Sequence, residues 1–554
     1  MTGAELSAGS AGARARSRGR AFADRAIVGA RIRTLDPARP FAEAVALRGG
    51  TIVAVGDEAE VRAHCDGATE LIDGRGSTVV PGLVDAHMHP LWAAEFAQGA
   101  ELAGSGALAE LGARLRRERA ARGGDPHAVV RGWGAEYALF AAGGLDGALL
   151  EGLAGGPALI TFFDCHTHLA TPSVLARAGI RGAEPFADNS QIVCRDDGRP
   201  TGELREFEAY DRVAASLPQL PPGEAQERIA ATFARMAAAG LTGAHAMDGS
   251  AATLDVLREL EAAERLTARL VVPVWVKPGM DDDELEALLA LREQHGRLWR
   301  GGVAKFFIDG VVETGTSWLE EPDSSGEGRL PLWEDPQRYA DTVARFAAAG
   351  FQCVTHAIGD RAVRCALDAY RAAGAAPGVR HRIEHAESLP DGHLARIVAE
   401  DVILSMQPIH LQWRRPDGSD DWARRLGPAR TGRAFRFGDA LAAGAVVALG
   451  SDWPIADFDP LRGMAWARLR REPGRPERAA VEPGQVLDAE AALAGYTTAA
   501  AAAVGEQRLS GRIAPGMRAD LTLLDGDPVS VPADELPGVA VRATIVDGRT
   551  VHAA

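Results

Sequence analysis

Two histidines one residue apart end an apolar run near the start of the chain, "VVPGLVDAHMHP" from Val79 to Pro90. Side chains alternate along a strand, so His87 and His89 share one face while Met88 points to the other. Paired imidazoles at a strand end suit a borderline cation such as zinc. A hydrogen-bonded pair in the core is the alternative, and this motif by itself does not decide between the two.

Lysine is rare in this chain: only Lys277 and Lys305 stand among 60 basic side chains. Lys305 lies within the apolar run "GGVAKFFIDG", and a buried ammonium has to be neutral or paired. One alternative is a lysine that reaches the rim or pairs with Asp309 or Glu313. The other, which we favour, is a carbamate formed with CO₂, an anionic ligand that can bridge two metals and that arginine cannot form. Lys277, at a predicted strand end, needs no special role.

The middle of the chain alternates apolar strands with amphipathic helices, which is typical of an α/β protein built from βα units. Eight such units predict a (β/α)8 TIM-type barrel. Residues 91–222, between the first two strands, are too long for a loop and are expected to form an insertion. The predicted strands are residues 83–89, 241–247, 269–277, 302–309, 351–357, 381–386, 402–408 and 445–452, with helical patterns at 225–239, 281–294, 360–373 and 390–400.

Both chain ends carry short alternating strands. Gly49-Gly50 and Asp547-Gly548 are hairpin signals. We therefore expect a small composite β-sandwich built from residues 25–82 and 508–554, beside a barrel over residues 83–507. Residues 1–24 contain four arginines and no apolar segment, which favours a disordered leader over a signal peptide.

The predicted strands bring further metal-capable side chains to one end of the barrel. His356 ends the fifth strand, His385 the sixth and Asp452 the eighth. Each of them alone is more often a hydrogen-bonded core residue or a turn residue. Because the carboxyl ends of barrel strands form the active face, their joint occurrence with His-x-His indicates a metal site.

Charge and cysteine content exclude several classes of function. The net charge of −16 comes from evenly spread acidic residues, which gives no support for a nucleic-acid partner. The five cysteines are odd in number and form no CxxC, so reduced thiols and a cytoplasmic location are expected. No run of 18 apolar residues predicts a membrane span. The expected partner is a small-molecule substrate, and a homodimer is left open.

Several motifs, taken in order, resemble the amidohydrolase superfamily and within it the YtcJ-like branch, which includes N-substituted formamide deformylases. The resemblance covers about residues 25–552 and implies a metal-bearing (β/α)8 barrel with a composite β-sandwich. The motifs are "VVPGLVDAHMHP", "VAKFFIDGVVE", "VTHAIGDRAV", "HRIEHAESL", "SMQPIHLQW", "ALGSDWPI" and the closing "GYTTAAAAAVGEQRLSGRIAPGMRADLTLLDGDP".

The resemblance implies a role for each candidate ligand. His87 and His89 would bind one metal, His356 and His385 a second, and a carboxylated Lys305 would bridge them. Asp452 would bind metal and act as the proton shuttle. One or two zinc ions are expected, with other divalent metals as alternatives.

A second set of residues is expected to contact substrate. "ITFFDCHTHLATPSVLARAGI" resembles a segment of the branch in which His166 matches a histidine, Cys165 replaces a glycine and Thr171 replaces an asparagine. "DGRPTGELRE" matches another, with Gly202 and Glu206; a turn glycine and a capping glutamate are the alternatives. The loop after Lys305 matches only loosely. The predicted substrate-binding residues are His166, Trp92, Asp309, Trp318 and Gln407, and Trp133, His410 and Trp413 are further candidates for the pocket wall.

The predicted reaction is hydrolysis of a C–N bond in an amide, formamide, carbamate or cyclic amide by metal-activated hydroxide. Asp452, Lys305 and His166 are the expected catalytic residues. Asp452 would serve as base and then acid, while His166 would hydrogen-bond the carbonyl oxygen or a substrate anion. The alternatives are a lactonase, a carbamate or ester hydrolase, a phosphotriesterase, a non-catalytic scaffold, and a structural zinc site, which is usually closed and cysteine-rich.

Overall fold

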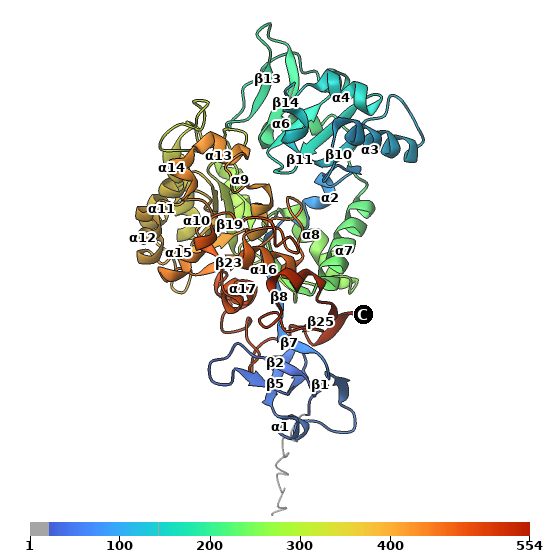
Figure 1. The fold of residues 1–554 in the computed structure, drawn as a ribbon, viewed down its shortest axis with the longest axis vertical. Helices are drawn as coiled ribbons and strands as arrows, with labels where there is room; N and C mark the ends of the chain where they lie inside the picture. Colours follow the sequence, from blue (N-terminus) through green and yellow to red (C-terminus); the bar gives the residue numbers. More distant parts are fainter. Residues whose placement is uncertain (1–21, 142) are drawn as a thin grey trace, which may run out of the picture.

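The computed structural model describes residues 22–141 and 143–554, so the predicted leader lies outside the described residues up to residue 21. Three regions follow one another along the long axis of the molecule (Figure 1). A small β-rich region holds the first strands, a large α/β region occupies the middle, and a second α/β region lies at the far end. The middle region contains the predicted barrel strands, and the far region is the predicted insertion.

All eight predicted barrel strands are present, and they pair in parallel in two sheets. Only the third is interrupted, at Val272-Pro273, because proline has no N–H for the ladder. One sheet has the order β18-β16-β15-β8 and the other β17-β19-β20-β21-β22-β23. Their bounds are β8 Leu83–Met88, β15 Leu241–Ala246, β16 Arg269–Val271, β17 Val274–Trp275, β18 Trp299–Arg300, β19 Val303–Phe307, β20 Gln352–Ala357, β21 Arg382–His385, β22 Ile403–Met406 and β23 Val447–Leu449.

The segment after the last strand lies beside the end of the first. The backbone N–H of His89 donates to the carbonyl of Trp453 and that of Asp452 to the carbonyl of His87, both at 2.7 Å. The buried Asp85 carboxylate accepts the N–H of Ser451 at 3.1 Å. These bonds place Asp452 directly next to the His-x-His motif.

Helices separate most of the strands and bury one face each. In α11, for example, Ala362, Val363, Ala366, Leu367 and Tyr370 are buried, a spacing that marks one side of a helix. The helices of this region are α7 Pro222–Ala238, α8 Ala251–Ala262, α9 Asp282–Leu289, α10 Pro336–Ala348, α11 Asp360–Ala373, α12 Asp391–Ala399, α13 Asp421–Leu426, α14 Pro428–Thr431, α15 Phe437–Ala442, α16 Pro460–Leu469, α17 Ala489–Gly495 and α18 Thr498–Ala502, with 3₁₀ turns at Pro408–Trp413, Pro483–Gln485 and Ala533–Gly538.

The insertion is a folded unit with its own mixed sheet, of order β13-β14-β12-β11-β10-β9. Apolar side chains of its helices and strands form two separate buried clusters. The turn between β11 and β12 reaches back toward the middle region and carries His166. The elements are α2 Ala93–Phe96, β9 Ala100–Glu101, α3 Leu108–Ala121, β10 Val130–Ala135, a 3₁₀ turn Tyr137–Phe140, α4 Gly147–Ala154, β11 Ala158–Phe162, β12 Thr167–Ala170, α5 Pro172–Arg177, β13 Gln191–Cys194, β14 Pro200–Arg205 and α6 Phe207–Ala214.

Strands from the two chain ends share a sheet, because β7 pairs antiparallel with β24. Both predicted hairpins form, and their two central residues have positive φ, as a tight primed turn requires. One sheet has the order β5-β4-β1-β6 and the other β26-β25-β24-β7-β2-β3. The bounds are β1 Arg25–Val28, β2 Arg31–Arg33, β3 Phe41–Ala42, β4 Ala44–Arg48, β5 Thr51–Gly56, α1 Glu58–Arg62, β6 Glu70–Asp73, β7 Thr78–Pro81, β24 Leu521–Leu524, β25 Val541–Val546 and β26 Arg549–Ala553.

Among the described residues, no helix combines the length and the apolar character needed to cross a membrane. The five cysteines form no disulfide.

Candidate active site

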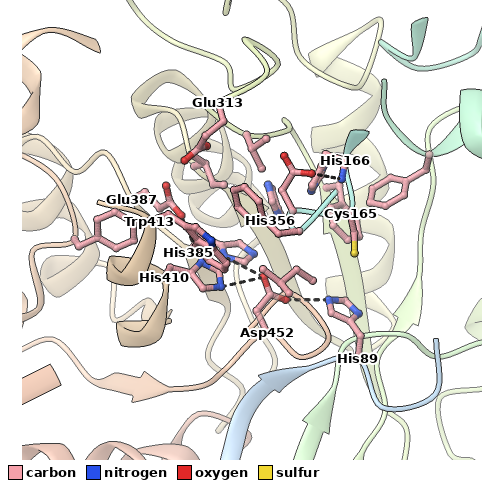
Figure 2. A pocket seen from close by; sticks show the side chains of 18 of the residues that line it. His89, Cys165, His166, Glu313, His356, His385, Glu387, His410, Trp413 and Asp452 are labelled. Atoms are coloured by element: carbon pink, nitrogen blue, oxygen red, sulfur yellow. Dashed lines mark hydrogen bonds and ion pairs between the residues drawn. The ribbon is translucent and has the colours of Figure 1, made fainter. Parts of the chain in front are cut away.

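Asp452 is the point at which the candidate ligands meet (Figure 2). Its Oδ1 lies 3.2 Å from Nε2 of both His87 and His89. Its Oδ2 lies 3.7 Å from Nε2 of His410 and 4.0 Å from Nδ1 of His385. In the described part of the chain, two triads could therefore hold a metal ion, each with ligand atoms within 4.8 Å of one another: His87, His89 and Asp452, and His385, His410 and Asp452.

The histidines of this cluster have buried ring nitrogens without hydrogen-bond partners among the described residues, including Nδ1 of His385 and Nε2 of His87 and His410. Buried polar atoms are rarely left in that state, and a set of imidazoles with a carboxylate suits a divalent transition metal. Burial lowers the pKa of His89 to about 4 and that of His385 well below its ordinary value. The imidazoles of His89 and His385 are therefore neutral, which is the form that binds metal, so this donor set fits such an ion.

The Asp452 side chain is ionised in this setting. Burial acts to raise its pKa, but the neighbouring His87 and His89 outweigh burial and hold the pKa well below the ordinary value. The carboxylate can therefore act both as a ligand and as a proton acceptor.

A chain of buried, hydrogen-bonded polar groups sets the orientation of the His87 ring. Its Nδ1 donates to Oε2 of Glu384 at 2.6 Å, and Nη2 of Arg382 donates to the same oxygen at 2.8 Å. Nη1 of Arg382 then donates to Nδ1 of His245 at 2.8 Å. Arg382 and Glu384 are fully buried and His245 nearly so. This arrangement selects the tautomer of His87 that leaves Nε2 free for the site.

Glu384 and Arg382 are not among the residues predicted from the sequence. A signal was available, because "HRIEH" places two opposite charges two residues apart in a buried strand, where both face the same side.

Lys305 is fully buried, and its Nζ has no hydrogen-bond partner among residues 22–141 and 143–554. The ammonium lies 4.6 Å from the ring centroid of Phe307. The alternative in which Asp309 or Glu313 pairs with this lysine is wrong, since neither carboxylate bonds to it. Burial lowers the pKa of Lys305 to about 8, which increases the fraction of neutral amine.

His356 and His410 differ from the sequence expectation. The ring of His356 lies 4.4 Å from that of His385, but its Nε2 lies 3.3 Å from the carbonyl of Gly310 and it belongs to neither triad around Asp452. Its role as a ligand of a second metal stays a prediction. His410, which we expected only in the pocket wall, is the residue that completes the second triad with His385 and Asp452.

The cavity above Asp452 is lined by two of the predicted substrate-binding residues, His166 and Trp92, and by His410 and Trp413. It is also lined by His89, Phe163, Asp164, Cys165, Phe207, Phe307, Val311, Glu313, His356, Ile358, His385, Glu387, Arg414, Phe435, Asp452 and Ile455.

Asp309, Trp318 and Gln407 are buried and lie outside the lining of this cavity, so their role as substrate contacts stays a prediction. The fully buried Asp309 carboxylate accepts the backbone N–H groups of Trp318 and Gly359 at 2.8 Å and of Ile358 at 3.1 Å. It therefore ties the loop after β19 to the loop after β20. Trp133 also lies outside the lining and packs against Trp453, with ring centroids 5.7 Å apart.

His166 reaches the cavity as an ion-pair partner of Glu206. Its Nδ1 lies 2.7 Å from Oε2 of the fully buried Glu206. Burial alone would lower the pKa of His166, but the charge of Glu206 raises it to about 9. His166 thus presents a cation to the cavity at neutral pH. Glu206 occupies the N-cap position of α6, but its side chain makes no capping hydrogen bond and pairs with His166 instead.

The departures from the branch motif have structural explanations. Cys165 has φ +58°, in the left-handed region that glycine favours, which is consistent with the glycine usual at this position. The Thr171 hydroxyl accepts the N–H of Ala158 at 3.1 Å and lies outside the cavity lining. Gly202 lies within β14 and not in a turn, so the turn alternative is wrong. Its φ is +104°, and a Cβ there would lie 2.5 Å from the carbonyl oxygen of Ala170, so the backbone at this position requires glycine.

Comparison with known families gives a match to the model described as "Amidohydrolase family" over residues 70–552. The chain belongs to the amidohydrolase family. It is therefore a hydrolase that acts on carbon–nitrogen bonds, and the predicted resemblance is confirmed.

Two curated relatives match this amidohydrolase over nearly its whole length. Putative amidohydrolase YtcJ of Bacillus subtilis is 27% identical, with 92% of this chain and 96% of the relative covered. N-substituted formamide deformylase of Arthrobacter pascens is 28% identical, with 95% and 97% covered.

Two solved structures share the fold. A metal-dependent hydrolase from Pyrococcus horikoshii has a TM-score of 0.71 at 22% identity, with 92% of this chain and 99% of that chain covered. The zinc complex of an atrazine chlorohydrolase from Arthrobacter aurescens has a TM-score of 0.54 at 18% identity, with 95% and 94% covered. At these identities the likeness establishes an amidohydrolase fold of the TIM-barrel type and nothing about substrate.

Proposed function

We propose that this amidohydrolase uses a divalent cation, zinc in the first instance, to hydrolyse an amide, formamide or cyclic amide. The observation that carries the proposal is the convergence of four imidazoles on the two oxygens of one buried, ionised Asp452. The name of the Arthrobacter pascens relative, a formamide deformylase, favours the formamide among these substrates.

The residues that would hold the ion are His87, His89 and Asp452, with His385 and either His356 or His410 for a second ion. A divalent cation bound there supplies Lewis acidity and lowers the pKa of water toward neutrality. All remaining roles fall to side chains of the protein.

Asp452 is proposed as the proton shuttle. As an ionised carboxylate it accepts a proton from the attacking water, and it then donates that proton to the leaving nitrogen as the C–N bond breaks. His166 is proposed to donate a hydrogen bond through Nε2 to the carbonyl oxygen, on which negative charge develops. Glu206 holds the His166 ring in place through Nδ1.

Lys305 is proposed to carry a carbamate. The lone pair of its neutral amine attacks CO₂, a new C–N bond forms, and the nitrogen releases one proton to solvent, which leaves an anionic carboxylate at the end of the side chain. Protein equilibrated with ¹³C-labelled bicarbonate should show one carbamate resonance by ¹³C NMR that is missing in Lys305→Met and retained in Lys277→Met. A spectrum without that resonance in the wild type overturns this assignment.

For the architecture, we propose that the two parallel sheets form one closed (β/α)8 barrel over residues 83–507 and that both chain ends build a composite β-sandwich from residues 25–82 and 508–554. The backbone bonds between His87 and Asp452 and the pairing of β7 with β24 support this division. A small molecule is the proposed partner.

The test of function is a substrate panel with metal analysis. Purified protein should contain about one or two divalent ions per chain, hydrolyse amides or formamides, lose activity on chelation and regain it with zinc. Preferential turnover of lactones, aryl esters or phosphotriesters would assign a different bond to the same site. Protein with no metal and no turnover of any of these substrates would support the scaffold alternative.

A further inference from the structure

One wall of the cavity carries two neighbouring glutamates that have no basic side chain at hydrogen-bond distance among the described residues. Figure 2 places Glu313 and Glu387 on one side and His89 and Cys165 on the other. Glu313 and Glu387 come from the loops after β19 and β21, and both line the cavity. The charge of Asp164 also acts on Glu313, so this wall adjoins the segment that carries His166.

The two carboxylates have no cationic partner at hydrogen-bond distance among the described residues. Oε2 of Glu387 accepts the indole N–H of Trp422 at 2.9 Å, and Oε1 lies 3.8 Å from Nδ1 of His410. No ion pair within 4 Å joins Glu313 to a basic side chain in the described ranges, and Arg414 pairs with Asp420 instead. Burial and the charge of Glu387 raise the pKa of Glu313 to about 8, so the two glutamates hold one proton between them at neutral pH, and a cation bound beside them would favour the ionised form of both. Together with the burial of Glu387, this makes the wall suitable for an ammonium group.

Arg414 contributes the opposite charge to the same wall. Its side chain is 2% exposed, its Nε donates to Asp420 at 3.0 Å, and its guanidinium lies 4.2 Å from the ring centroid of Trp422. Both terminal nitrogens are buried without hydrogen-bond partners among the described residues. A buried guanidinium with two free nitrogens is a bidentate site for a carboxylate.

The space between these charges is apolar. The rings of Phe163 and Trp413 stack at a centroid distance of 4.3 Å, and both line the cavity with Phe435 and Val311. Such walls suit a chain of methylene groups between a reacting amide near Asp452 and a charged end at the glutamates and arginine.

We propose that the substrate carries an amino acid head group at the end remote from the scissile bond, with its ammonium at Glu313 and Glu387 and its carboxylate at Arg414. The substrate class is then the side-chain N-acyl derivatives of diamino acids. The identity of the cleaved bond in this proposal rests on the proposed function. The identity of the head group rests only on the residues of the cavity wall.

Four formamides with the same spacer test the proposal. Nε-formyl-lysine carries both charges, N-formylcadaverine only the ammonium, N-formyl-6-aminohexanoate only the carboxylate, and N-pentylformamide neither. Each charge that is recognised should raise kcat/KM by about tenfold or more, so the lysine derivative should exceed the neutral compound by roughly a hundredfold. A neutral compound within threefold of the lysine derivative overturns the proposal, as does either singly charged compound matching it.

Variants assign each charge to its residue. Glu313→Gln should reduce the ratio of kcat/KM between N-formylcadaverine and N-pentylformamide, and Arg414→Lys should reduce the ratio between N-formyl-6-aminohexanoate and N-pentylformamide. Ratios within one variant cancel a loss of folded protein. Glu321→Gln, an exposed position outside the cavity lining, is the matched control and should leave both ratios unchanged. Ratios that persist in both cavity variants contradict the assignment.

Binding of the product separates this proposal from the function itself. Calorimetry on the purified metal-containing enzyme should show lysine binding at least tenfold more tightly than pentylamine. If no formamide is turned over but lysine is preferred, the proposed function fails and the head-group site stands. If formamides are hydrolysed and pentylamine binds as well as lysine, the head-group site fails and the function stands.

Discussion

At the scale of single residues, Asp452 combines two roles that a substitution can separate. Asp452→Asn keeps the shape of the side chain and one ligand oxygen but cannot accept a proton from water. We expect metal content near that of the wild type and a fall in kcat of about 10²–10⁴-fold. Metal content by mass spectrometry and kcat on the best substrate of the panel provide the check. Asp457→Asn, on the exposed loop nearby, should be neutral, and near-normal turnover in Asp452→Asn would remove the shuttle role.

The His166–Glu206 pair makes a pH-dependent contribution to stability. The folded pKa of His166 is about 9 against an ordinary value of 6.5, so the pair stabilises the folded state fully below pH 6.5 and loses that effect as pH rises through about 9. A shift of this size corresponds to roughly 3 kcal/mol. The difference in free energy of unfolding between wild type and Glu206→Gln, from urea titrations, should therefore be larger at pH 6 than at pH 9.5. Glu321→Gln should show no such trend, and a constant difference for Glu206→Gln would contradict the ion pair.

At the scale of elements, β21 supports β8 through the buried hydrogen bond between Glu384 and His87. Glu384→Gln removes the charge that holds His87 and leaves the buried Arg382 with a neutral acceptor. The loss of this support should weaken metal binding by about 10–100-fold and lower Tm. Competition with a chromogenic chelator measures the affinity of the folded protein, and near-UV circular dichroism confirms that it is folded. The exposed Glu293→Gln is the control, and unchanged affinity in Glu384→Gln would show that His87 needs no such support.

The barrel strands could be predicted from the sequence because buried parallel strands are apolar runs. The metal-capable residues could be predicted because the carboxyl ends of the strands converge in this fold. The sequence did not predict where each side chain points once a strand has ended. Lys305 and Asp309 would share a face if the strand continued, but β19 ends at Phe307 and Asp309 turns away into the loops. His410 enters the site through the 3₁₀ turn Pro408–Trp413, whose position depends on contacts distant in the sequence.

At the scale of the whole molecule, the terminal sheet and the middle region are joined by buried hydrogen bonds from two threonines. The Thr522 hydroxyl donates to the carbonyl of Gly240 at 2.7 Å, and the Thr544 hydroxyl to that of Ala237 at 2.6 Å. Both threonines are fully buried, and both carbonyls lie in the segment between α7 and β15 or at the end of α7. The C-terminal strands are thus hydrogen-bonded to the segment that leads from α7 into β15, one of the parallel strands around the site.

Replacing both hydroxyls tests how strongly the two regions stabilise each other. Valine has nearly the same shape as threonine, so Thr522→Val with Thr544→Val removes two donors. The Gly240 carbonyl loses the bond from Thr522, at a cost of about 1–3 kcal/mol, whereas the Ala237 carbonyl keeps the N–H of Gly240 at 3.0 Å and the loss of Thr544 costs about 1 kcal/mol. Scanning calorimetry should show a lower Tm, and a separate low-temperature transition if the terminal sheet loosens first. Thr550→Val, exposed on β26, should leave the trace unchanged. An unaltered Tm in the double variant would mean that β7–β24 pairing and apolar contact alone join the chain ends to the rest of the molecule.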